Sequence, residues 1–415
     1  MVAGPPPRLF KIVTLCIVSR DAVTMVDRNR LVAEFTECYG TTPRVFSAPG
    51  RVNIIGEHTD YNDGFVLPVA IDRRTYVAIA PRKDRRVHVA SRVLNDTAEF
   101  AIDRADDSQL HQWAKYVAGV TWTLQAQGIA LNGADVLIDS DVPIGGGLSS
   151  SAALEVATGK ALTTIAGAII DPRDLALAAQ KAEHDFVGAK VGIMDQLAAT
   201  LGRQQHALLI DCRSLATREI PLANLNAAIV VCNTNVKHEL MSSAYNQRRA
   251  DCEEGVQLLR KFLPDIRALR DVSVAQFEKY EDELPAPLRR RCRHVVTENE
   301  RTVRAAEALE RGDREQLGQL MRQSHESLKD DYEVSCRELD AMVEIAWRQQ
   351  GTFGARMTGG GFGGCTINIV RADAVPSFIR AVKQEYRFAT EIDPEIFLVK
   401  ADDGAREEVA SAPDR

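Results

Sequence analysis

The most chemically suggestive stretch of the sequence lies near its start, where polar side chains follow a short apolar segment. Val52 to Ile55 is typical of the end of a buried strand, after the turn-forming Pro49-Gly50. Six hydrogen-bonding side chains then follow within seven residues: Glu57, His58, Asp60, Tyr61, Asn62 and Asp63. So many polar groups between apolar strands are poorly suited to a core. They predict a pocket for a ligand that carries several hydroxyl groups.

A second stretch combines glycine with serine, in the run Gly145-Gly-Gly-Leu-Ser-Ser-Ser151 between an expected strand and an expected helix. Glycine lets the backbone approach an anion, and a helix N-terminus offers free N–H groups. The serine hydroxyls add donors or a magnesium ligand. We therefore predict a phosphate-binding loop, and the alternative is a flexible turn before a serine-capped helix. The sequence GxxxxGK[ST] does not occur, which excludes a Walker loop.

Two acidic residues are further candidates for chemistry. Asp195 lies in the loop Gly192-Ile-Met-Asp-Gln among apolar neighbours, where a carboxylate is suited to act as a general base. The alternative for Asp195 is a helix cap or an ion-pair partner. Glu183 is suited either to bind a metal or to face solvent. The histidines outside the first stretch show no paired ligand spacing, so we expect structural or surface roles for them.

A third glycine-rich segment resembles a dinucleotide fingerprint but lacks its context. Gly359, Gly361 and Gly364 match GxGxxG. In a dinucleotide-binding domain a helix follows this motif, whereas here the strand-like Cys365-Thr-Ile-Asn-Ile-Val comes next. We therefore predict a tight glycine turn between two strands, close to a ligand or to the other domain. A dinucleotide oxidoreductase is disfavoured.

The spacing of apolar residues predicts the elements that must position these groups. We expect strands in 43–102 and at 134–139, 207–211, 228–233, 356–358, 365–370 and 396–400. We expect helices at 27–39, 111–127, after Ser151, from Asp171-Pro172 through Glu183, and at 242–262, 273–281, 286–311, 313–330, 336–350 and 373–386.

Length and composition restrict the class of protein. A chain of 415 residues predicts two domains. The net charge of −7 gives no basic surface of the kind that binds nucleic acid. No apolar run reaches the roughly 18 residues of a membrane span. The eight cysteines form no CxxC pair, which favours reduced thiols in a cytoplasmic protein. We place the domains at 25–220 and 221–402. Residues 1–24 are expected to form a disordered extension and 403–415 a disordered tail.

Three separated motifs resemble the signature motifs of the GHMP kinases of sugars and other small molecules. They are GRVNIIGEHTDYNDGFVLP at 50–68, VPIGGGLSSSAALEVA at 142–157 and RMTGGGFGGCTINIV at 356–370. Within that superfamily, the block Gly56-Glu-His-Thr-Asp-Tyr-Asn62 resembles the galactokinase family, as do the Gly192 loop and the segment 233–249. The resemblance implies an α+β fold of two domains. The N-terminal domain would resemble ribosomal protein S5, and the C-terminal domain would be ferredoxin-like.

The resemblance also implies an activity, the ATP-dependent phosphorylation of D-galactose at its anomeric hydroxyl, and a role for each matching residue. Asp195 would take the hydroxyl proton, and Arg51 would stabilise the ionised carboxylate and then the transferred phosphoryl group. The implied sugar-binding residues are Glu57, His58, Thr59, Asp60, Gly192 and Tyr245. The implied ATP-binding residues are Ser91, Gly145, Gly146, Gly147, Leu148, Ser149, Ser150 and Ser151. Ser151 and Glu183 would bind Mg²⁺.

Two alternatives stay open on the sequence. One is a related kinase for N-acetylgalactosamine, arabinose or a uronic acid, because selectivity depends on a few buried polar contacts. The other is a non-catalytic galactose sensor, which the presence of Arg51, Asp195 and an uninterrupted GGGLSSSA disfavours. The expected partner is a small-molecule sugar rather than a nucleic acid or a membrane, and we expect a monomer.

Overall fold

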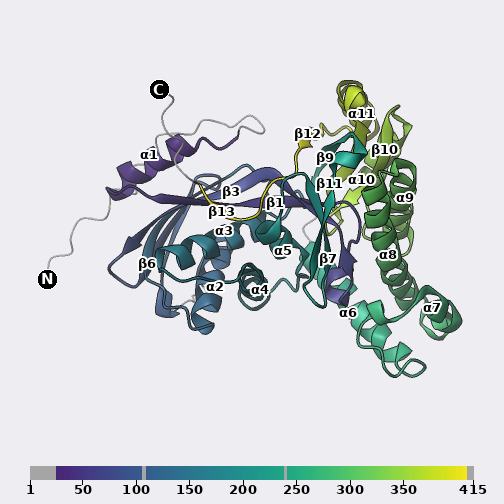
Figure 1. The fold of residues 1–415 in the computed structure, drawn as a ribbon, viewed down its shortest axis with the longest axis horizontal. Coiled ribbons are helices and arrows are strands. Elements are labelled where there is room, and N and C mark those ends of the chain that lie inside the picture. The colour runs from purple at the N-terminus through teal and green to yellow at the C-terminus, as the bar shows by residue number, and fades with distance from the viewer. Residues whose placement is uncertain (1–24, 105–108, 238–240, 409–415) are drawn as a thin grey trace.

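A computed structural model describes residues 25–104, 109–237 and 241–408. The chain forms two sheet-and-helix halves that lie side by side (Figure 1). The long strands β1 (Arg44–Asn53) and β3 (Pro68–Arg82) lie along the upper side of the first half and reach toward the second. The sugar-pocket stretch predicted from sequence directly follows β1. It therefore lies where the two halves meet.

The first half is built on a six-stranded sheet in the order β13-β1-β3-β6-β4-β5. Its strands pair antiparallel except for β4 with β6. Helix α1 packs on one face, and α2, α3 and α4 cover the other (Figure 1). The further elements of this half are β4 (Arg86–Ser91), β5 (Asp96–Ala101), β6 (Gly133–Ser140), α1 (Arg28–Tyr39), α2 (Gln112–Ala126), α3 (Ser150–Ile165), α4 (Pro172–Ala182) and α5 (Met194–Leu201). A three-stranded sheet of β2 (Phe65–Val66), β7 (His206–Asp211) and β8 (Thr217–Pro221) extends it.

The second half is built on a four-stranded antiparallel sheet in the order β10-β11-β9-β12. Helices precede β10 and separate β11 from β12, which gives the β-α-β-β-α-β order of a ferredoxin-like unit with extra helices inserted. Its elements are β9 (Ala227–Lys237), α6 (Met241–Leu259), α7 (Val274–Tyr280), α8 (Ala286–Arg311), α9 (Arg314–Asp330), α10 (Arg337–Arg348), β10 (Thr352–Thr358), β11 (Gly363–Arg371), α11 (Val375–Thr390) and β12 (Glu395–Val399). The predicted α+β architecture is confirmed.

Local chemistry explains why these helices begin and end where they do. The Asp27 carboxylate accepts hydrogen bonds from the Asn29 and Arg30 amides at the start of α1, and Gly40 ends that helix with φ of 70°. At α4, Asp171 caps the first turn and Pro172 occupies the first helical position, where its missing N–H costs nothing. These signals are local, so the sequence alone predicts them well.

The differences from the predicted elements lie mostly at ends. Helix α6 ends at Leu259 rather than 262, and α11 runs from Val375 to Thr390 rather than over 373–386. The predicted helix through Glu183 continues beyond α4 as one π-helical turn, Glu183–Val187. Strand β8 was not predicted, because Ile220 is its only buried residue and the others carry little apolar signal. The proposed extension at 1–24 lies outside the described residues.

The prediction of a disordered tail after Asp402 is wrong for residues 403–408. Strand β13 (Arg406–Glu407) pairs antiparallel with β1 and forms one edge of the first sheet. The fully buried Arg74 of β3 fixes this segment by donating to the Asp402 carboxylate at 2.8 Å. It also donates to the carbonyl oxygens of Asp403 and Gly404 at 2.7 and 2.8 Å. An isolated tail sequence does not reveal such a distant partner.

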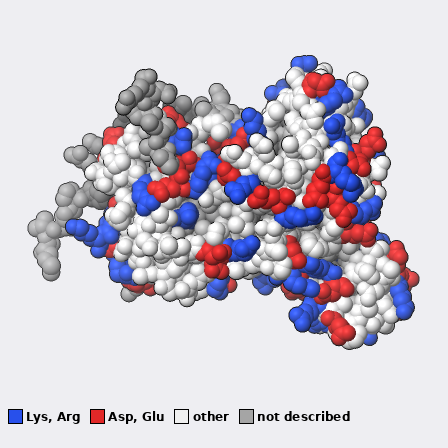
Figure 2. Space-filling model, in the orientation of Figure 1, with Lys and Arg blue, Asp and Glu red and all other residues white. Residues whose placement is uncertain are grey.

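Surface charge agrees with the composition. On the face drawn in Figure 2, lysine and arginine side chains alternate with acidic ones, and no extended basic patch appears on it. Among the helices of the described residues, none has the length and apolar character that a membrane span requires.

The Arg74 contacts lead to a prediction about stability. Arg74→Met should lower the free energy of unfolding by about 2–4 kcal/mol, because the Asp403 and Gly404 carbonyl groups lose their buried donor and the Asp402 carboxylate loses its closer ion pair, keeping the longer one with Arg406 at 3.2 Å. Arg44→Met is the matched control. Arg44 also binds the C-terminal segment, through Glu407, but both side chains are more than a third exposed. Its loss should cost no more than about 1 kcal/mol. Urea unfolding of both variants makes the comparison, and equal losses would contradict it.

Candidate active site

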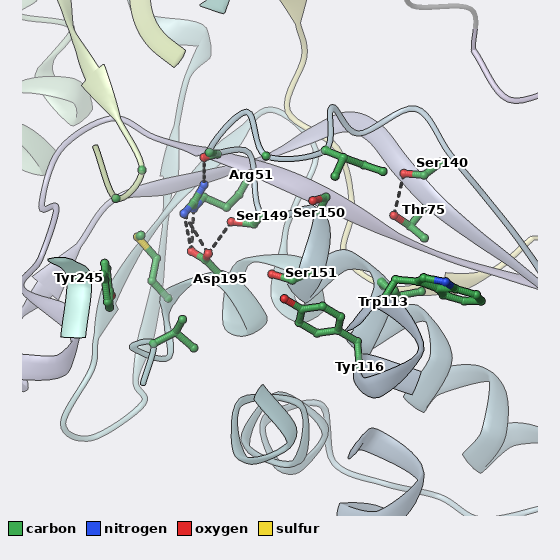
Figure 3. Close-up of a pocket in the computed structure, with 18 of the residues that line it drawn as sticks. Arg51, Thr75, Trp113, Tyr116, Ser140, Ser149, Ser150, Ser151, Asp195 and Tyr245 are labelled. Carbon is green, nitrogen blue, oxygen red and sulfur yellow. Dashed lines mark hydrogen bonds and ion pairs between the residues drawn. The ribbon is translucent and has the colours of Figure 1, made fainter. Parts of the chain in front are cut away.

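A cavity of about 470 Å³ lies between the two halves, and most of the site residues predicted from sequence line it. At one end it is polar, lined by Arg51, Glu57, His58, Asp60, Gly192, Asp195 and Tyr245. The opposite end contains Trp113 and Tyr116 (Figure 3), and the apolar residues of the cavity wall also include Val93, Leu94, Ile138, Ile144 and Leu154. Figure 3 shows Ser149, Ser150 and Ser151 between these ends, with Asp195 and Tyr245 on one side and Tyr116 and Trp113 on the other.

The polar end is organised by an ion pair between β1 and α5. Arg51 binds the Asp195 carboxylate with two parallel hydrogen bonds, Nε to Oδ1 at 2.8 Å and Nη2 to Oδ2 at 2.9 Å. A third Arg51 nitrogen donates to the Gly147 carbonyl oxygen at 2.6 Å. The Arg51 side chain is only 5% exposed, whereas that of Asp195 is 24% exposed and faces the cavity. Asp195 is therefore held in place on one side and open to a ligand on the other.

Ser149 joins this ion pair to the glycine-serine loop. Its hydroxyl donates to Asp195 Oδ2 at 2.5 Å instead of capping α3. Its backbone has φ of 61°, a left-handed conformation that is uncommon for serine and typical of functional turns. The N–H groups of the first turn of α3 are thus left for another acceptor, and the positive end of the helix dipole favours an anion there.

The two glycine-rich segments pack backbone against backbone at this point. A Cβ on Gly359 would lie 2.8 Å from the Gly147 carbonyl oxygen, and one on Gly364 would lie 3.1 Å from that of Gly146. Glycine is required because the backbones approach this closely. The prediction of a tight glycine turn between strands is confirmed, since β10 precedes it and β11 follows it. The absence of a helix after this turn excludes a dinucleotide fingerprint.

The Asp60 carboxylate also lies in close contact with the backbone of Gly192. A Cβ on Gly192 would lie 1.8 Å from Asp60 Oδ2, so only glycine fits beside this carboxylate. Burial, and then the negative charge of Asp195, raise the pKa of Asp60 to about 6. The Gly192 amide donates to the Tyr245 hydroxyl group, which brings α6 to the same wall.

Glu57 lines the cavity but is largely occupied by other protein groups. Its carboxylate forms a buried ion pair with Arg356 Nη1 at 2.7 Å. It also accepts from Asn53 Nδ2 at 2.7 Å and from the Gly359 amide at 2.9 Å. Burial raises the pKa of Glu57 above its ordinary value, against the opposing effect of Arg356. Glu57 thus connects the loop after β1 to the glycine turn.

Not all of the predicted residues face the cavity. Thr59 is fully buried and does not line it, because its hydroxyl donates to the carbonyl oxygens of Gly56 and Phe65. Its side chain therefore shapes the turn rather than contacting a ligand. Leu148 is directed into the core, and Gly146 does not line the cavity either. Ser91, Gly145, Gly147 and all three serines do line it.

The predicted metal ligands lie together, and the chemistry around them fits a cation. Ser151 hydrogen-bonds to Glu183, and Gln196 Nε2 donates to both Glu183 and Glu155 at 3.0 and 3.1 Å. Burial, and then the charge of Asp195, raise the pKa of Glu183 to about 8. A cation beside Ser151 would offset this concentration of negative charge. No group of three or more metal-binding side chains occurs among the described residues, so an ion here would need ligands from phosphate or water, as Mg²⁺ commonly does.

Several lining residues were not predicted from sequence. Trp113 and Tyr116 both lie on α2, and both line the cavity. Val93, Leu94 and Ile144 are unusual because they are large apolar side chains that are 40–46% exposed. A ligand with an apolar face would cover them. Exposure of this kind has no signal in a single sequence.

Comparison with known proteins agrees with this geometry. A model described as the galactokinase galactose-binding signature matches residues 33–81, and the models of the GHMP kinase N-terminal and C-terminal domains match residues 115–203 and 305–387. The galactokinase of Chloroflexus aurantiacus is 52% identical, over 88% of this chain and 94% of its own. The chain belongs to the galactokinase family. A galactokinase of Roseiflexus is 50% identical, over 92% of this chain and 97% of its own.

Solved structures extend the comparison to the fold. A crystal structure of Lactococcus lactis galactokinase complexed with galactose matches with a TM-score of 0.89 and 36% identity, over 92% of this chain and 99% of that one. The mevalonate kinase of Methanococcus jannaschii matches with a TM-score of 0.61 and 20% identity, over 87% and 98%. The second match shows a shared fold alone. The predicted fold class and family are both confirmed.

The raised pKa of Glu183 predicts a pH dependence of stability. Its folded-state pKa of about 8 exceeds the ordinary value, so the folded protein holds this proton more tightly than the unfolded chain does. The resulting stability is present at low pH and is lost as the pH rises toward 8. Without divalent ions, the free energy of unfolding should therefore fall between about pH 5 and 8.

Urea unfolding across that range tests this prediction. Glu183→Gln should reduce the slope, whereas Glu300→Gln, at an exposed position on α8, should preserve it. A wild-type protein whose stability is level over this range, or a Glu183→Gln variant with the wild-type slope, would refute the assignment.

Proposed function

We propose that this member of the galactokinase family transfers the γ-phosphoryl group of ATP to the anomeric hydroxyl of D-galactose, giving galactose 1-phosphate and ADP. The observation that carries the proposal is the Arg51–Asp195–Ser149 cluster, which lies where the polar end of the cavity meets the N-terminus of α3. A sugar hydroxyl beside Asp195 would point at a phosphate bound by the loop 145–151. Phosphoryl transfer depends mainly on such positioning and on electrostatic stabilisation.

The polar end is suited to galactose. Asp60 and Asp195 offer carboxylate oxygens that accept from sugar hydroxyls, and His58 and Tyr245 complete the wall. Gly192 keeps the loop before α5 close to Asp60. The intact Arg51–Asp195 pair supports an enzyme over a non-catalytic sensor.

The apolar end is suited to the adenine base of ATP. The phosphates of ATP would then point toward the N-terminus of α3. Val93, Leu94 and Ile144 would bury their exposed apolar surface against the base, and Trp113 and Tyr116 offer aromatic faces. Ser150 and the free amides at the start of α3 would bind the phosphates.

The transfer can be followed through the protein's own groups. Asp195 accepts the proton of the anomeric hydroxyl as its oxygen bonds to the γ-phosphorus, while the bond from that phosphorus to the bridging oxygen breaks and ADP leaves. Arg51 keeps the Asp195 carboxylate oriented and offers positive charge to the transferring group. Ser151 and Glu183 would hold Mg²⁺, which when bound neutralises phosphate charge.

We also propose that the enzyme works as a monomer in the cytoplasm. One chain supplies every residue that lines the cavity, and the seven cysteines in the described ranges are free thiols.

An ADP-release assay with a panel of sugars tests the proposed reaction. Wild-type protein should turn over galactose in preference to N-acetylgalactosamine, arabinose and galacturonic acid. Asp195→Ala should lower kcat by about 10²–10⁴-fold, because it removes the general base. Calorimetry should show that the variant still binds galactose. Absence of galactose turnover in the wild type, or full activity in Asp195→Ala, would overturn the assignment.

Gly192→Ala tests the sugar end separately. The added methyl group collides with the Asp60 carboxylate, so the KM for galactose should rise at least about tenfold, while the KM for ATP stays within about twofold. Gly167→Ala is the control, because a Cβ there meets no atom within 4 Å and Gly167 does not line the cavity, so the backbone strain of alanine at its φ of 71° costs stability without touching the site. It should leave both KM values unchanged. A parallel rise in both KM values for Gly192→Ala would indicate general disruption instead.

A further inference from the structure

The stretch that carries the sugar-pocket residues rests on one helix of the second half. The Gly56 amide donates to the Glu298 carboxylate of α8, with 3.0 Å between N and Oε1. One helical turn earlier, His294 Nε2 donates to the Glu57 carbonyl oxygen at 3.1 Å. One turn later, Thr302 packs so closely that a Cβ on Gly56 would lie 2.9 Å from its hydroxyl oxygen. Residues 294, 298 and 302 are four apart, so one face of α8 supports this stretch.

Glu298 is fully buried, and its other contacts come from the second half as well. Its Oε1 accepts a second hydrogen bond from the Ser324 hydroxyl of α9 at 2.5 Å, and Oε2 forms an ion pair with Arg301 Nε at 2.7 Å. Burial alone would raise the pKa of Glu298, but nearby positive charge, chiefly that of Arg301, lowers that pKa to about 2. The carboxylate is therefore ionised at neutral pH, and its hydrogen bond with the Gly56 amide is charge-assisted.

Two ion pairs of opposite orientation meet behind the sugar end. Arg356 of β10 is fully buried and pairs with Glu57 at 2.7 Å, and its charge also acts on Glu298, the partner of Arg301. Burying charge is costly, and well-packed apolar side chains are often at least as stable in such places. That cost is consistent with a role in fixing the position of the sugar-pocket stretch rather than in stabilising the fold.

We propose that Glu298 is a positioning residue, which holds the Gly56 amide and thereby fixes the sugar-pocket stretch that follows it. That stretch supplies Glu57, His58 and Asp60 to the cavity wall. Glu298 itself does not line the cavity, so it would act on the sugar only through these residues. A displacement of about 1 Å in such residues is enough to impair a reaction strongly. This inference rests on the proposed function, because it takes galactose as the ligand of the polar end.

Hydrogen–deuterium exchange measures the position of this stretch without any substrate. In the wild type the Gly56 amide should exchange slowly, because it is buried and donates to a charged acceptor. In Glu298→Gln, exchange in the peptide 54–60 should become at least about tenfold faster, while exchange in β11, an interior strand, stays within about twofold. Wild-type exchange at 54–60 in Glu298→Gln would overturn the proposal.

Kinetics test the consequence for the sugar. An amide has one acceptor oxygen where a carboxylate has two, so Glu298→Gln cannot accept from both Gly56 and Arg301. The KM for galactose should rise about tenfold, with the KM for ATP within about twofold of wild type. Ser324→Ala should raise the KM for galactose about threefold, because Gly56 keeps its charged acceptor. The double variant should be no worse than Glu298→Gln alone, since both changes act on one contact.

Arg74→Met is the matched control. Arg74 is also a buried charged side chain in an ion pair, but its partner lies in the C-terminal segment, and Arg74 does not line the cavity. Its loss should leave the KM for galactose and the exchange at 54–60 at wild-type level. A comparable rise in Arg74→Met, or a parallel rise of both KM values in Glu298→Gln, would refute the positioning role, because lost stability would then explain the effect. If the wild type fails to phosphorylate galactose, the proposed function fails, while the exchange at 54–60 still decides whether Glu298 holds Gly56.

Discussion

The bidentate pairing of Arg51 with Asp195 is the interaction on which the rest of the site depends. It joins β1 to α5, and through the third guanidinium nitrogen it also fixes Gly147 of the glycine-serine loop. Planar, charge-assisted pairs of this kind fix orientation as well as distance. One arginine therefore aligns a candidate base with the N-terminus of the helix that would receive the phosphates. A lysine could not make these three directed contacts.

Around this pair the fold concentrates negative charge. Burying several carboxylates together lowers the stability of the folded protein. Asp60, Asp195, Glu183 and Glu155 all lie in or directly behind the cavity, and burial together with mutual repulsion raises the pKa of three of them. The proposed Mg²⁺ ion and sugar hydroxyl groups would offset this repulsion when they bind. The same carboxylates would thus lower the stability of the ligand-free protein and raise its affinity for the proposed ligands.

Much of this could be predicted from sequence, because the signals were local or carried by motifs. Asp171-Pro172 marks a helix start, and the strand after Gly364 rules out a dinucleotide fold. The unpredicted features depend on residues far apart in the chain. Trp113 lies on a helix whose apolar face is otherwise core, and only the tertiary fold exposes it to the cavity. The donor role of Ser149 toward Asp195 and the buried pair of Glu57 with Arg356 likewise join distant segments.

The edge strand β13 has a consequence for how the chain is made. It pairs with β1, near the other end of the sequence, and Arg74 of β3 holds the segment that leads into it. During synthesis, β1 and β3 emerge from the ribosome long before residues 402–408 do. Until then, the buried guanidinium group of Arg74 lacks three of its acceptors, and one edge of the first sheet is open to other strands. The core of the first half can therefore form during translation. Its first sheet is complete only when β13 has emerged and paired with β1.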